Sequence, residues 1–329
     1  MVKMMFRRSI ILLISLSLIL TACSPNLNPT TNPTVTEVPA TLAIPTGTAI
    51  TGAPVKPITM VDGLGREIEL PGPAQRIISL TPATTEILFA IGAGTQVVGR
   101  DTFSDYPAEA GSVTDIGGSM GKYNTEAMVN LQPDLIVAGG INPPELVASL
   151  ESLGLQVFFL ANPTTLDELY TSIKTVGDLT GNESGAADVV AKMESKVKEI
   201  DTRLTGITER PMLYYELDAT PFTAGPGTFV DLLITRAGGT NFGANMDSAW
   251  AQISLEQLLL ADPAFIILGD SAYGETVATV TARPGWNALT AVKDLKIFPF
   301  DDNLVSRPGP RLVDGLEALA HLIHPEAFK

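Results

Sequence analysis

The sequence predicts an α/β protein of two lobes, each with a mostly parallel sheet flanked by helices, joined by one long backbone helix. Strand-like and helix-like segments alternate along residues 58–329, which is typical of parallel sheets covered on both faces. Residues 182–207 break this rhythm with a single long apolar stripe. A helix-to-strand pattern also occurs twice with equal spacing, at Glu126, Pro133 and Gly139 and again at Glu256, Pro263 and Gly269.

Composition limits the classes of function that the chain can have. Of its 329 residues, 45% are hydrophobic, which is enough for large cores. The chain has 36 acidic and 21 basic residues, and the resulting net charge of −15 would repel a nucleic acid. A single cysteine excludes an intramolecular disulfide, and two histidines near the carboxyl terminus argue against a histidine-rich metal site. We therefore expect no metal site and no resident cofactor.

Residues 1–23 have the composition of a secretion signal. Three basic residues precede the apolar run SIILLISLSLIL, which is too short to span a bilayer comfortably. The next segment, LTAC, resembles the bacterial lipobox, whose cysteine, here Cys23, is lipidated and becomes the mature amino terminus. The alternative is an ordinary signal peptide with a chance cysteine. Residues 24–57, rich in Pro and Thr, are predicted to be a disordered tether. With Cys23 lipidated, we expect a lipid-anchored protein on the outer face of the cell membrane.

Residues 58–181 are predicted to form the amino-terminal lobe. Two alternating runs around Asp62–Gly65 indicate a hairpin, and strands are expected at 76–80, 96–99 and 156–160. A helix is predicted at 84–94, and a helix running into a buried strand at 124–140. A further amphipathic helix at 144–154 would place Leu146, Leu150 and Leu153 on one face.

Residues 182–208 are predicted to be the helix between the lobes, roughly 35–40 Å long and capped by Asn182. Its apolar stripe comprises Ala186, Val190, Met193, Val197, Ile200, Leu204 and Ile207. Residues 209–329 then repeat the alternation as the carboxy-terminal lobe, with a closing helix from about residue 311. Paired glycines, Gly92–Gly94 and Gly238–Gly239, end corresponding helices, which favours a duplication. The alternative is that any helix-to-strand unit looks alike, since Pro ends helices and Gly ends strands.

Residues 58–329 resemble the substrate-binding proteins of bacterial ABC importers, of the cobalamin and iron-siderophore type whose lobes are joined by one helix. The resemblance is carried by RIISLTPATTEILFAIGAG, DTFSDYP, YNTEAMVNLQPDLIV, PFTAGPGTFVDLLI, WAQISLEQLL and SRPGPRLVDGLEALA, and it is strongest to the cobalamin-binding component. It implies a monomeric protein that is not an enzyme and that captures cobalamin or a related corrinoid as a transported ligand. The implied partner is a permease dimer with its ATPase subunits.

The resemblance also implies a role for the repeated pattern. In this family each lobe presents one acidic residue to one half of a two-fold permease, and the matching positions are Glu126 and Glu256. The alternative is that each glutamate only offsets the dipole of its helix, contributing about 0.3–1 kcal/mol. Both roles are compatible.

Ligand contacts are expected from loops that follow strands, at Phe103, Met120, Tyr123, Phe222, Trp250 and Arg307. Family correspondence supports four of them: Phe103, Phe222, Trp250 and Arg307. Two tryptophans of the cobalamin pattern are here Met120 and Gly139, which leaves a corrinoid precursor, haem or a ferric siderophore as alternative ligands.

Neighbouring residues have less direct interpretations. Tyr106 either packs in a turn or contacts the ligand, and Trp286 is expected to be packing. Arg311 is expected to pair within its own lobe, and His321 and His324 to be exposed to solvent.

Two other function classes are compatible with parts of the sequence. An enzyme using carboxylates has no identifiable pair, and no G-x-S-x-G, P-loop or complete dinucleotide motif is present. A ligand sensor that reports to a receptor would have the same sequence features, and only an absent permease or absent uptake would distinguish it.

Overall fold

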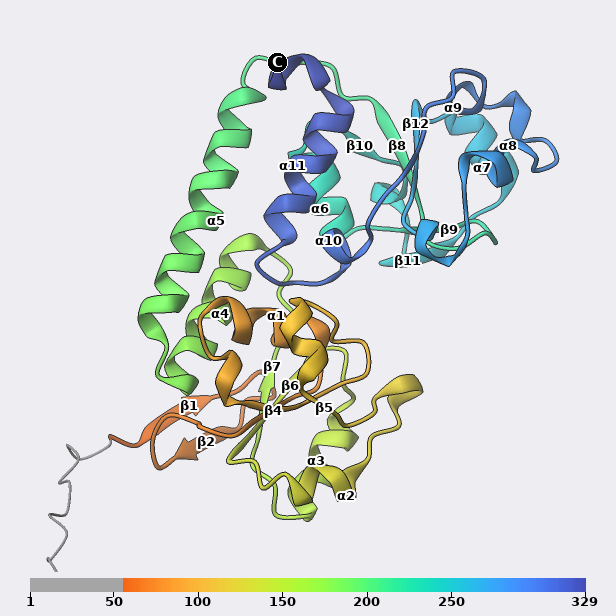
Figure 1. The fold of residues 1–329 in the computed structure, drawn as a ribbon. Helices are drawn as coiled ribbons and strands as arrows, with labels where there is room; N and C mark the ends of the chain where they lie inside the picture. Colours follow the sequence, from red (N-terminus) through yellow and green to blue (C-terminus); the bar gives the residue numbers. More distant parts are fainter. Residues whose placement is uncertain (1–55) are drawn as a thin grey trace, which may run out of the picture. The chain divides into compact units, whose positions relative to one another are not determined.

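The structure, a computed structural model, describes residues 56–329 (Figure 1). The predicted lipidation at Cys23, the signal segment 1–23 and nearly all of the tether 24–57 lie outside the described residues. From residue 56 onward, no helix is both long and apolar enough to cross a membrane. The described residues form two α/β lobes connected through the long helix α5 (Glu183–Arg203).

The amino-terminal lobe is built on a five-stranded parallel sheet in the order β5–β4–β3–β6–β7. These strands are β3 (Ile77–Ser79), β4 (Val97–Arg100), β5 (Thr114–Asp115), β6 (Leu135–Gly139) and β7 (Val157–Leu160). An antiparallel hairpin of β1 (Ile58–Val61) and β2 (Glu67–Leu70) precedes the sheet. The predicted hairpin, the strands and the helix-to-strand unit at 124–140 are confirmed.

Helices cover both faces of this sheet because successive strand residues point to opposite sides. Ile77 packs in the cluster that contains α1 (Pro82–Ala90) and α4 (Leu166–Thr180), and Ile78 in the cluster that contains α2 (Thr125–Asn130) and α3 (Pro144–Ser152). The predicted face of α3 is partly wrong. Val147 and Leu150 are buried, whereas Leu153 follows the end of the helix and is 49% exposed.

The carboxy-terminal lobe is built on a four-stranded parallel sheet in the order β10–β8–β12–β13. Its strands are β8 (Met212–Glu216), β10 (Thr240–Asn241), β12 (Phe265–Leu268) and β13 (Ile297–Pro299). One face packs with α6 (Phe229–Arg236) and α11 (Leu312–Ile323), and the other with α7 (Leu255–Ala261), α8 (Val277–Thr281) and α9 (Thr290–Lys293). A separate antiparallel pair, β9 (Phe222–Ala224) with β11 (Trp250–Gln252), and the short α10 (Asn303–Ser306) complete the lobe.

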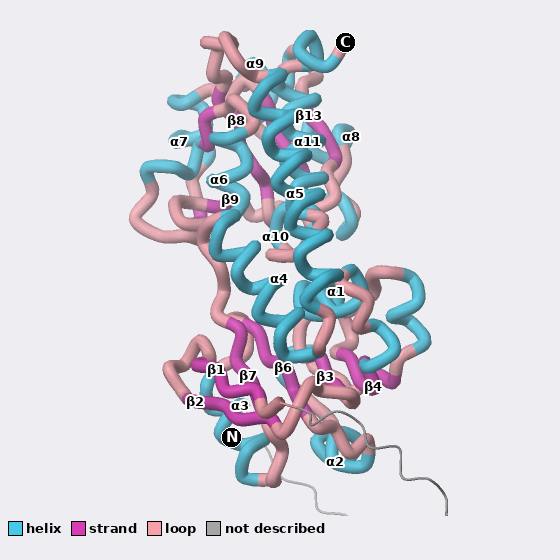
Figure 2. The backbone as a smooth tube through the Cα atoms, turned by 90° about the vertical axis from the view of Figure 1, so that its left-hand side faces the viewer, coloured by secondary structure: helices cyan, strands magenta, loops and turns pink. Residues whose placement is uncertain are grey.

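Helix α5 connects the two lobes, and its buried face packs in a hydrophobic core that includes residues of both. Its predicted stripe is buried from Ala186 to Ile200 and packs against α4 in one lobe and α11 in the other (Figure 2). With 21 residues the helix is about 31 Å long, shorter than predicted, because Gly206 at φ 86° turns the chain soon after Arg203. Asn182 occupies the N-cap position as predicted, but its side chain makes no capping bond, because its amide donates to Gln96 and Thr180. Helix α4 has no counterpart among the predicted elements.

The duplicated units agree in their local geometry. Met128 of α2 and Leu258 of α7, each two residues after the glutamate of its pattern, are fully buried. Both helices are followed by a residue in the left-handed region directly before the proline, Gln132 at φ 47° and Asp262 at φ 42°. Non-glycine residues rarely adopt this conformation, so its recurrence at matching positions supports a duplication rather than a general helix-to-strand pattern.

Candidate functional site

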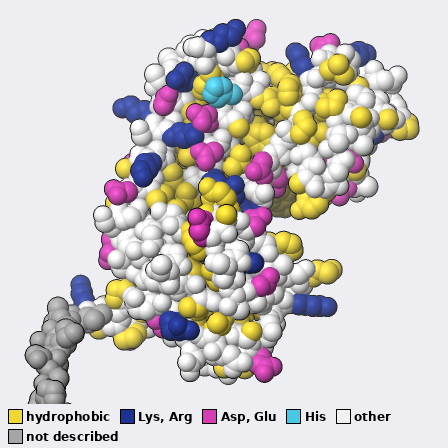
Figure 3. Space-filling model, in the orientation of Figure 1, with side chains coloured by type: hydrophobic (Ala, Val, Ile, Leu, Met, Phe, Trp, Pro, Cys, Tyr) yellow, Lys and Arg dark blue, Asp and Glu magenta, His cyan; other side chains and the backbone are white. Residues whose placement is uncertain are grey.

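A cavity of about 380 Å³ lies between the lobes, lined by residues from both. The amino-terminal lobe contributes the start of α1 and the loops that follow β6 and β7, and the carboxy-terminal lobe contributes the start of α6, Trp250 and residues 305–308. In Figure 3 the surface is hollowed between the lobes, and hydrophobic side chains gather along the upper wall of the hollow. The volume falls in the range of small-molecule sites, roughly 300–1,000 Å³.

Two helices begin at this cavity from opposite lobes. Thr81 caps α1 by accepting from the Thr84 amide at 3.2 Å, and Thr228 caps α6 by accepting from the Asp231 amide at 3.1 Å. Both capping residues line the cavity. Helix starts carry partial positive charge, so these two favour ligand atoms that accept hydrogen bonds.

The wall at the end of β6 depends on a glycine. A Cβ on Gly139 would lie 2.7 Å from the Thr81 methyl group, so the strand end approaches α1 more closely than a side chain permits. Behind this wall, Tyr123 is within hydrogen-bond distance of the Leu80 carbonyl and accepts from Asn142, whose amide oxygen accepts from the Gly139 N–H. Tyr123 therefore supports the wall and does not line the cavity.

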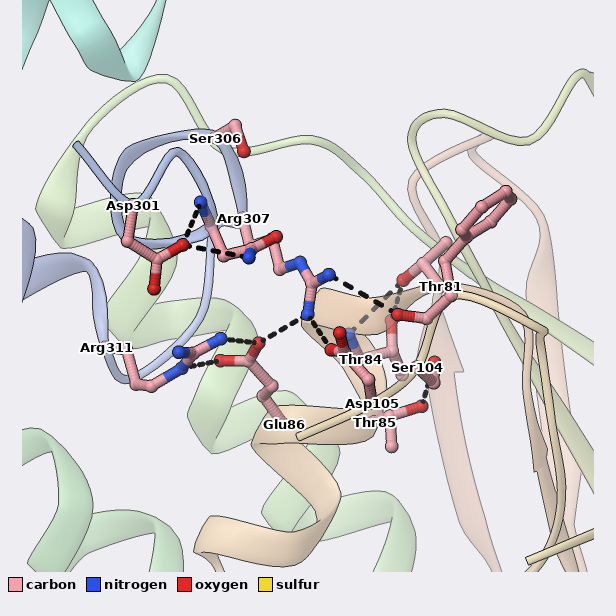
Figure 4. A network of polar contacts seen from close by, with 12 residues as sticks. Thr81, Thr84, Thr85, Glu86, Ser104, Asp105, Asp301, Ser306, Arg307 and Arg311 are labelled. Atoms are coloured by element: carbon pink, nitrogen blue, oxygen red, sulfur yellow. Dashed lines mark hydrogen bonds and ion pairs between the residues drawn. The ribbon is translucent and has the colours of Figure 1, made fainter. Parts of the chain in front are cut away.

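Arg307 is the only charged residue on the cavity wall among the described residues. It follows α10, and its Nη1 donates to Asp105 at 2.6 Å and to Glu86 at 3.3 Å (Figure 4). Glu86, on α1, is 2% exposed and also receives Nε and Nη2 of Arg311 at 2.9 and 2.6 Å. Hydrogen bonding to Glu86 raises the pKa of Arg311, whose guanidinium lies over the Tyr106 ring at 3.9 Å.

This four-residue group, Glu86, Asp105, Arg307 and Arg311, is called the inter-lobe ion cluster below. Its two carboxylates come from the amino-terminal lobe and its two guanidinium groups from the carboxy-terminal lobe, so it bridges the lobes beside the cavity (Figure 4). The expectation that Arg311 pairs within its own lobe is therefore wrong. A buried carboxylate needs a paired cation, and here the neighbouring lobe supplies two.

The predicted contact residues separate into two groups. Trp250, which pairs with Ala224 in the β9–β11 ribbon and is 51% exposed, lines the cavity together with Arg307. Four others lie outside its lining: Phe103, Met120, Tyr123 and Phe222. Phe103 and Met120 are exposed, and Phe222 is half-buried in the ribbon.

Two further expectations concern the carboxy-terminal lobe. Trp286 is buried as predicted, with the Arg283 guanidinium 4.5 Å from its ring. His321 is exposed, but the expectation for His324 is wrong. His324 is buried, and its Nε2 lies 3.1 Å from the Gly238 carbonyl, so it joins the end of α11 to the turn after α6.

A second buried charged group lies where β8 and β12 end. Glu216 is fully buried and receives Arg283 in a two-pronged ion pair, with Arg283 also reaching Glu275. Next to it, Asp270 is 4% exposed and neither carboxylate oxygen has a partner in the described part of the chain. Burial, assisted by the charge of Glu216, raises the pKa of Asp270 to about 7.

The two repeated glutamates are exposed at the starts of their helices. Asn124 caps α2 and Ser254 caps α7, each by accepting an amide of the first turn, and Glu126 and Glu256 follow two residues later. Hydrogen bonds from its own amide and from Ser254 lower the pKa of Glu256. Each carboxylate is available to an external cation.

Sequence reasoning missed Glu86, Asp105 and the capping threonines. One signal was present for Glu86, which is the only charged residue between Arg76 and Arg100. A lone charge inside an apolar helix implies a paired partner. Within residues 56–329, no cluster of three or more His, Cys, Asp or Glu residues is arranged to hold a metal ion.

Residues 77–304 match the family model described as "Periplasmic binding protein". The chain is 30% identical over 282 residues to an uncharacterized ABC transporter substrate-binding lipoprotein, YvrC, of Bacillus subtilis, covering 84% of this chain and 88% of the relative. It is 31% identical to a cobalamin-binding protein of Halobacterium salinarum, and the match covers 82% of this chain and 74% of the relative. Among solved structures, the periplasmic heme-binding protein RhuT from Roseiflexus sp. RS-1 superposes with a TM-score of 0.69 at 27% identity. The superposition covers 77% of this chain and 99% of RhuT.

Proposed function

This chain belongs to the periplasmic binding protein family, and on that premise we propose that it captures cobalamin or a related corrinoid between its lobes. It is a substrate-binding component of an ABC importer, of the vitamin B12, haem or siderophore type. The family consists of binding proteins, so the chain binds its ligand without transforming it.

The cavity between the lobes carries this proposal. Trp250 supplies an aromatic wall, which suits a flat macrocycle because it offers a large contact area at small entropic cost. The polar groups on the wall are mostly neutral, including the hydroxyl groups of Thr81 and Thr228 and the amide of Asn162. Side-chain amides at the rim of a corrinoid match such donors and acceptors. The cobalamin-binding relative supports the same ligand class.

Haem and a ferric siderophore are the alternative ligands, and the haem-binding neighbour supports the first of them. A carboxylate-rich ligand requires cationic groups, and within residues 56–329 the one cation on the wall, Arg307, is already paired. Of these ligands, the corrinoid therefore fits the wall best.

Delivery to the permease is proposed to use Glu126 and Glu256. They occupy matching places in duplicated units and are exposed at capped helix starts. A two-fold receptor offers the same surface twice, so a monomer that contacts both halves needs the same feature twice. Lipidation at Cys23 is proposed to hold the protein at the membrane.

The test is a titration that follows tryptophan fluorescence against cyanocobalamin, cobinamide, haemin and a ferric hydroxamate. Trp250 lines the cavity and Trp286 is buried, so saturable quenching reports the site. We expect quenching by the corrinoids that is lost in Trp250→Ala. A response to haemin or the siderophore alone would refute the corrinoid and keep the importer role. A sensor would bind its ligand without restoring uptake in cells that hold the permease.

A further inference from the structure

We propose that Glu86 and Asp105 determine the charge preference of the cavity: by compensating Arg307 and Arg311 they make it select ligands whose polar groups are uncharged. The proposal rests on the proposed function only in placing the ligand in this cavity. It assigns to two residues outside the cavity lining a role in deciding what the cavity accepts.

The first step is the charge balance of the inter-lobe ion cluster. Two guanidinium groups face two carboxylates, so the cluster has no net charge although its member Arg307 lies on the cavity wall. The two carboxylates meet at one atom, since Nη1 of Arg307 donates to both Glu86 and Asp105 (Figure 4). An anion arriving at Arg307 would therefore lie close to two negative charges.

The second step concerns the hydrogen-bonding capacity that remains. Nη2 of Arg307 has only a long contact of 3.4 Å to the Phe103 carbonyl, and its Nε has no acceptor within residues 56–329. A neutral acceptor such as an amide oxygen can use these N–H groups without displacing either carboxylate. A carboxylate ligand gains the same hydrogen bonds but also meets the repulsion of Glu86 and Asp105. The geometry thus favours the neutral ligand.

The third step separates the roles of the two carboxylates. Glu86 is buried and shared with Arg311, so it fixes the position of Arg307 as well as its charge. Asp105 is 68% exposed and pairs with Arg307 alone, so its removal changes the charge at little cost to folding. The pKa of Asp105 is lowered overall: partial burial raises it, but the hydrogen bond and the charge of Arg307 together outweigh that effect. Asp105 is therefore ionised at neutral pH.

The experiment uses the two tryptophans of the chain as the probe. Trp250 is 51% exposed on the cavity wall and Trp286 is 4% exposed, so collisional quenching in the full-length protein reports on Trp250. Iodide quenching depends on local charge, whereas acrylamide quenching does not. We expect Asp105→Asn and Glu86→Gln each to raise the iodide-to-acrylamide ratio of quenching constants about two-fold at low salt, because losing one negative charge beside the cavity makes the potential at its wall more positive.

A matched control has the same change in net charge elsewhere. Glu194→Gln, on an exposed position of α5, should leave the quenching ratio at its wild-type value. Wild-type ratios in both cluster variants would overturn the proposal. This measurement needs no ligand. If Glu86→Gln folds poorly, Asp105→Asn still decides the proposal, because the Asp105 side chain is exposed and its replacement should not disturb folding.

A second measurement uses a matched pair of ligands, cyanocobalamin and its monocarboxylic acid, in which one side-chain amide is replaced by a carboxylate. We expect the wild-type protein to prefer the amide, and Asp105→Asn to reduce that preference about ten-fold. An unchanged preference would overturn the proposal. Failure of cyanocobalamin to bind any variant would refute the proposed function instead, and the quenching ratios would still decide the charge preference.

Discussion

Replacing Glu86 with alanine removes the buried centre of the inter-lobe ion cluster. The wild-type carboxylate holds Arg311 through two hydrogen bonds of 2.6 and 2.9 Å and Arg307 through a third of 3.3 Å. The side chains of Arg307 and Arg311 are 14% and 16% exposed, so water cannot fully solvate guanidinium groups that lose this partner. The substitution therefore leaves Arg311 without its carboxylate partner, whereas Arg307 keeps Asp105.

The magnitude follows from these exposures. Removing one partner of a buried ion pair costs about 3–5 kcal/mol. Arg307 keeps Asp105 as a partner, which places the expected loss of unfolding free energy near the lower end, at about 3 kcal/mol. Arg311→Met removes the stranded charge, so in a double-mutant cycle the two substitutions should be coupled by about 2 kcal/mol.

Urea unfolding followed by circular dichroism measures the unfolding free energy of each protein in the double-mutant cycle.

A second assay measures the distance between the lobes, because the cluster joins them beside the cavity. Spin labels at Ser149→Cys and Ala278→Cys, in a Cys23→Ser background that removes the only native cysteine, report the distance between exposed helix positions of the two lobes. We expect a broader distance distribution in Glu86→Ala. A loss below about 1 kcal/mol, additivity within about 0.5 kcal/mol or an unchanged distribution would refute the reasoning.

Three further predictions concern the ligand, the permease and pH. Trp250→Ala should weaken ligand binding at least ten-fold in a fluorescence-independent assay such as calorimetry, and an unchanged dissociation constant would remove Trp250 from the site. Glu126→Ala or Glu256→Ala should leave ligand affinity intact and reduce uptake, and lost binding in either variant would contradict a docking role. The pKa of Asp270 is raised to about 7 from 3.8, so this carboxyl binds a proton in the folded state between these values and its contribution to stability falls as pH rises through that window. Asp270→Asn should remove this pH-dependent loss of stability. At pH 8 the variant should exceed the wild-type protein in unfolding free energy, measured with urea, by at most about 4 kcal/mol, and equal pH profiles of the two proteins would contradict the prediction.

Most of the fold could be predicted from local sequence patterns. The alternation of strands and helices and the stripe of α5 depend on residues a few positions apart, whose burial follows from backbone geometry alone. Helix α4 was equally local, with Thr165 as its cap and Leu169, Tyr170, Ile173 and Val176 on its buried face. The residues of α4 therefore carry enough local information to predict this helix. The prediction for α5 was too long because its apolar spacing continues past Arg203 to Leu204 and Ile207.

The sequence alone determined the class of this protein: two duplicated α/β lobes on one helix, the paired positions of Glu126 and Glu256, and membership of a family of binding proteins. The cavity wall was decided by tertiary structure. Glu86 meets its two arginines across more than 220 residues of chain, and no local spacing encodes a contact between side chains brought together only when the lobes pack. The same packing places Trp250 on the wall, whereas Tyr123 lies behind it through contacts with Leu80 and Asn142 of its own lobe.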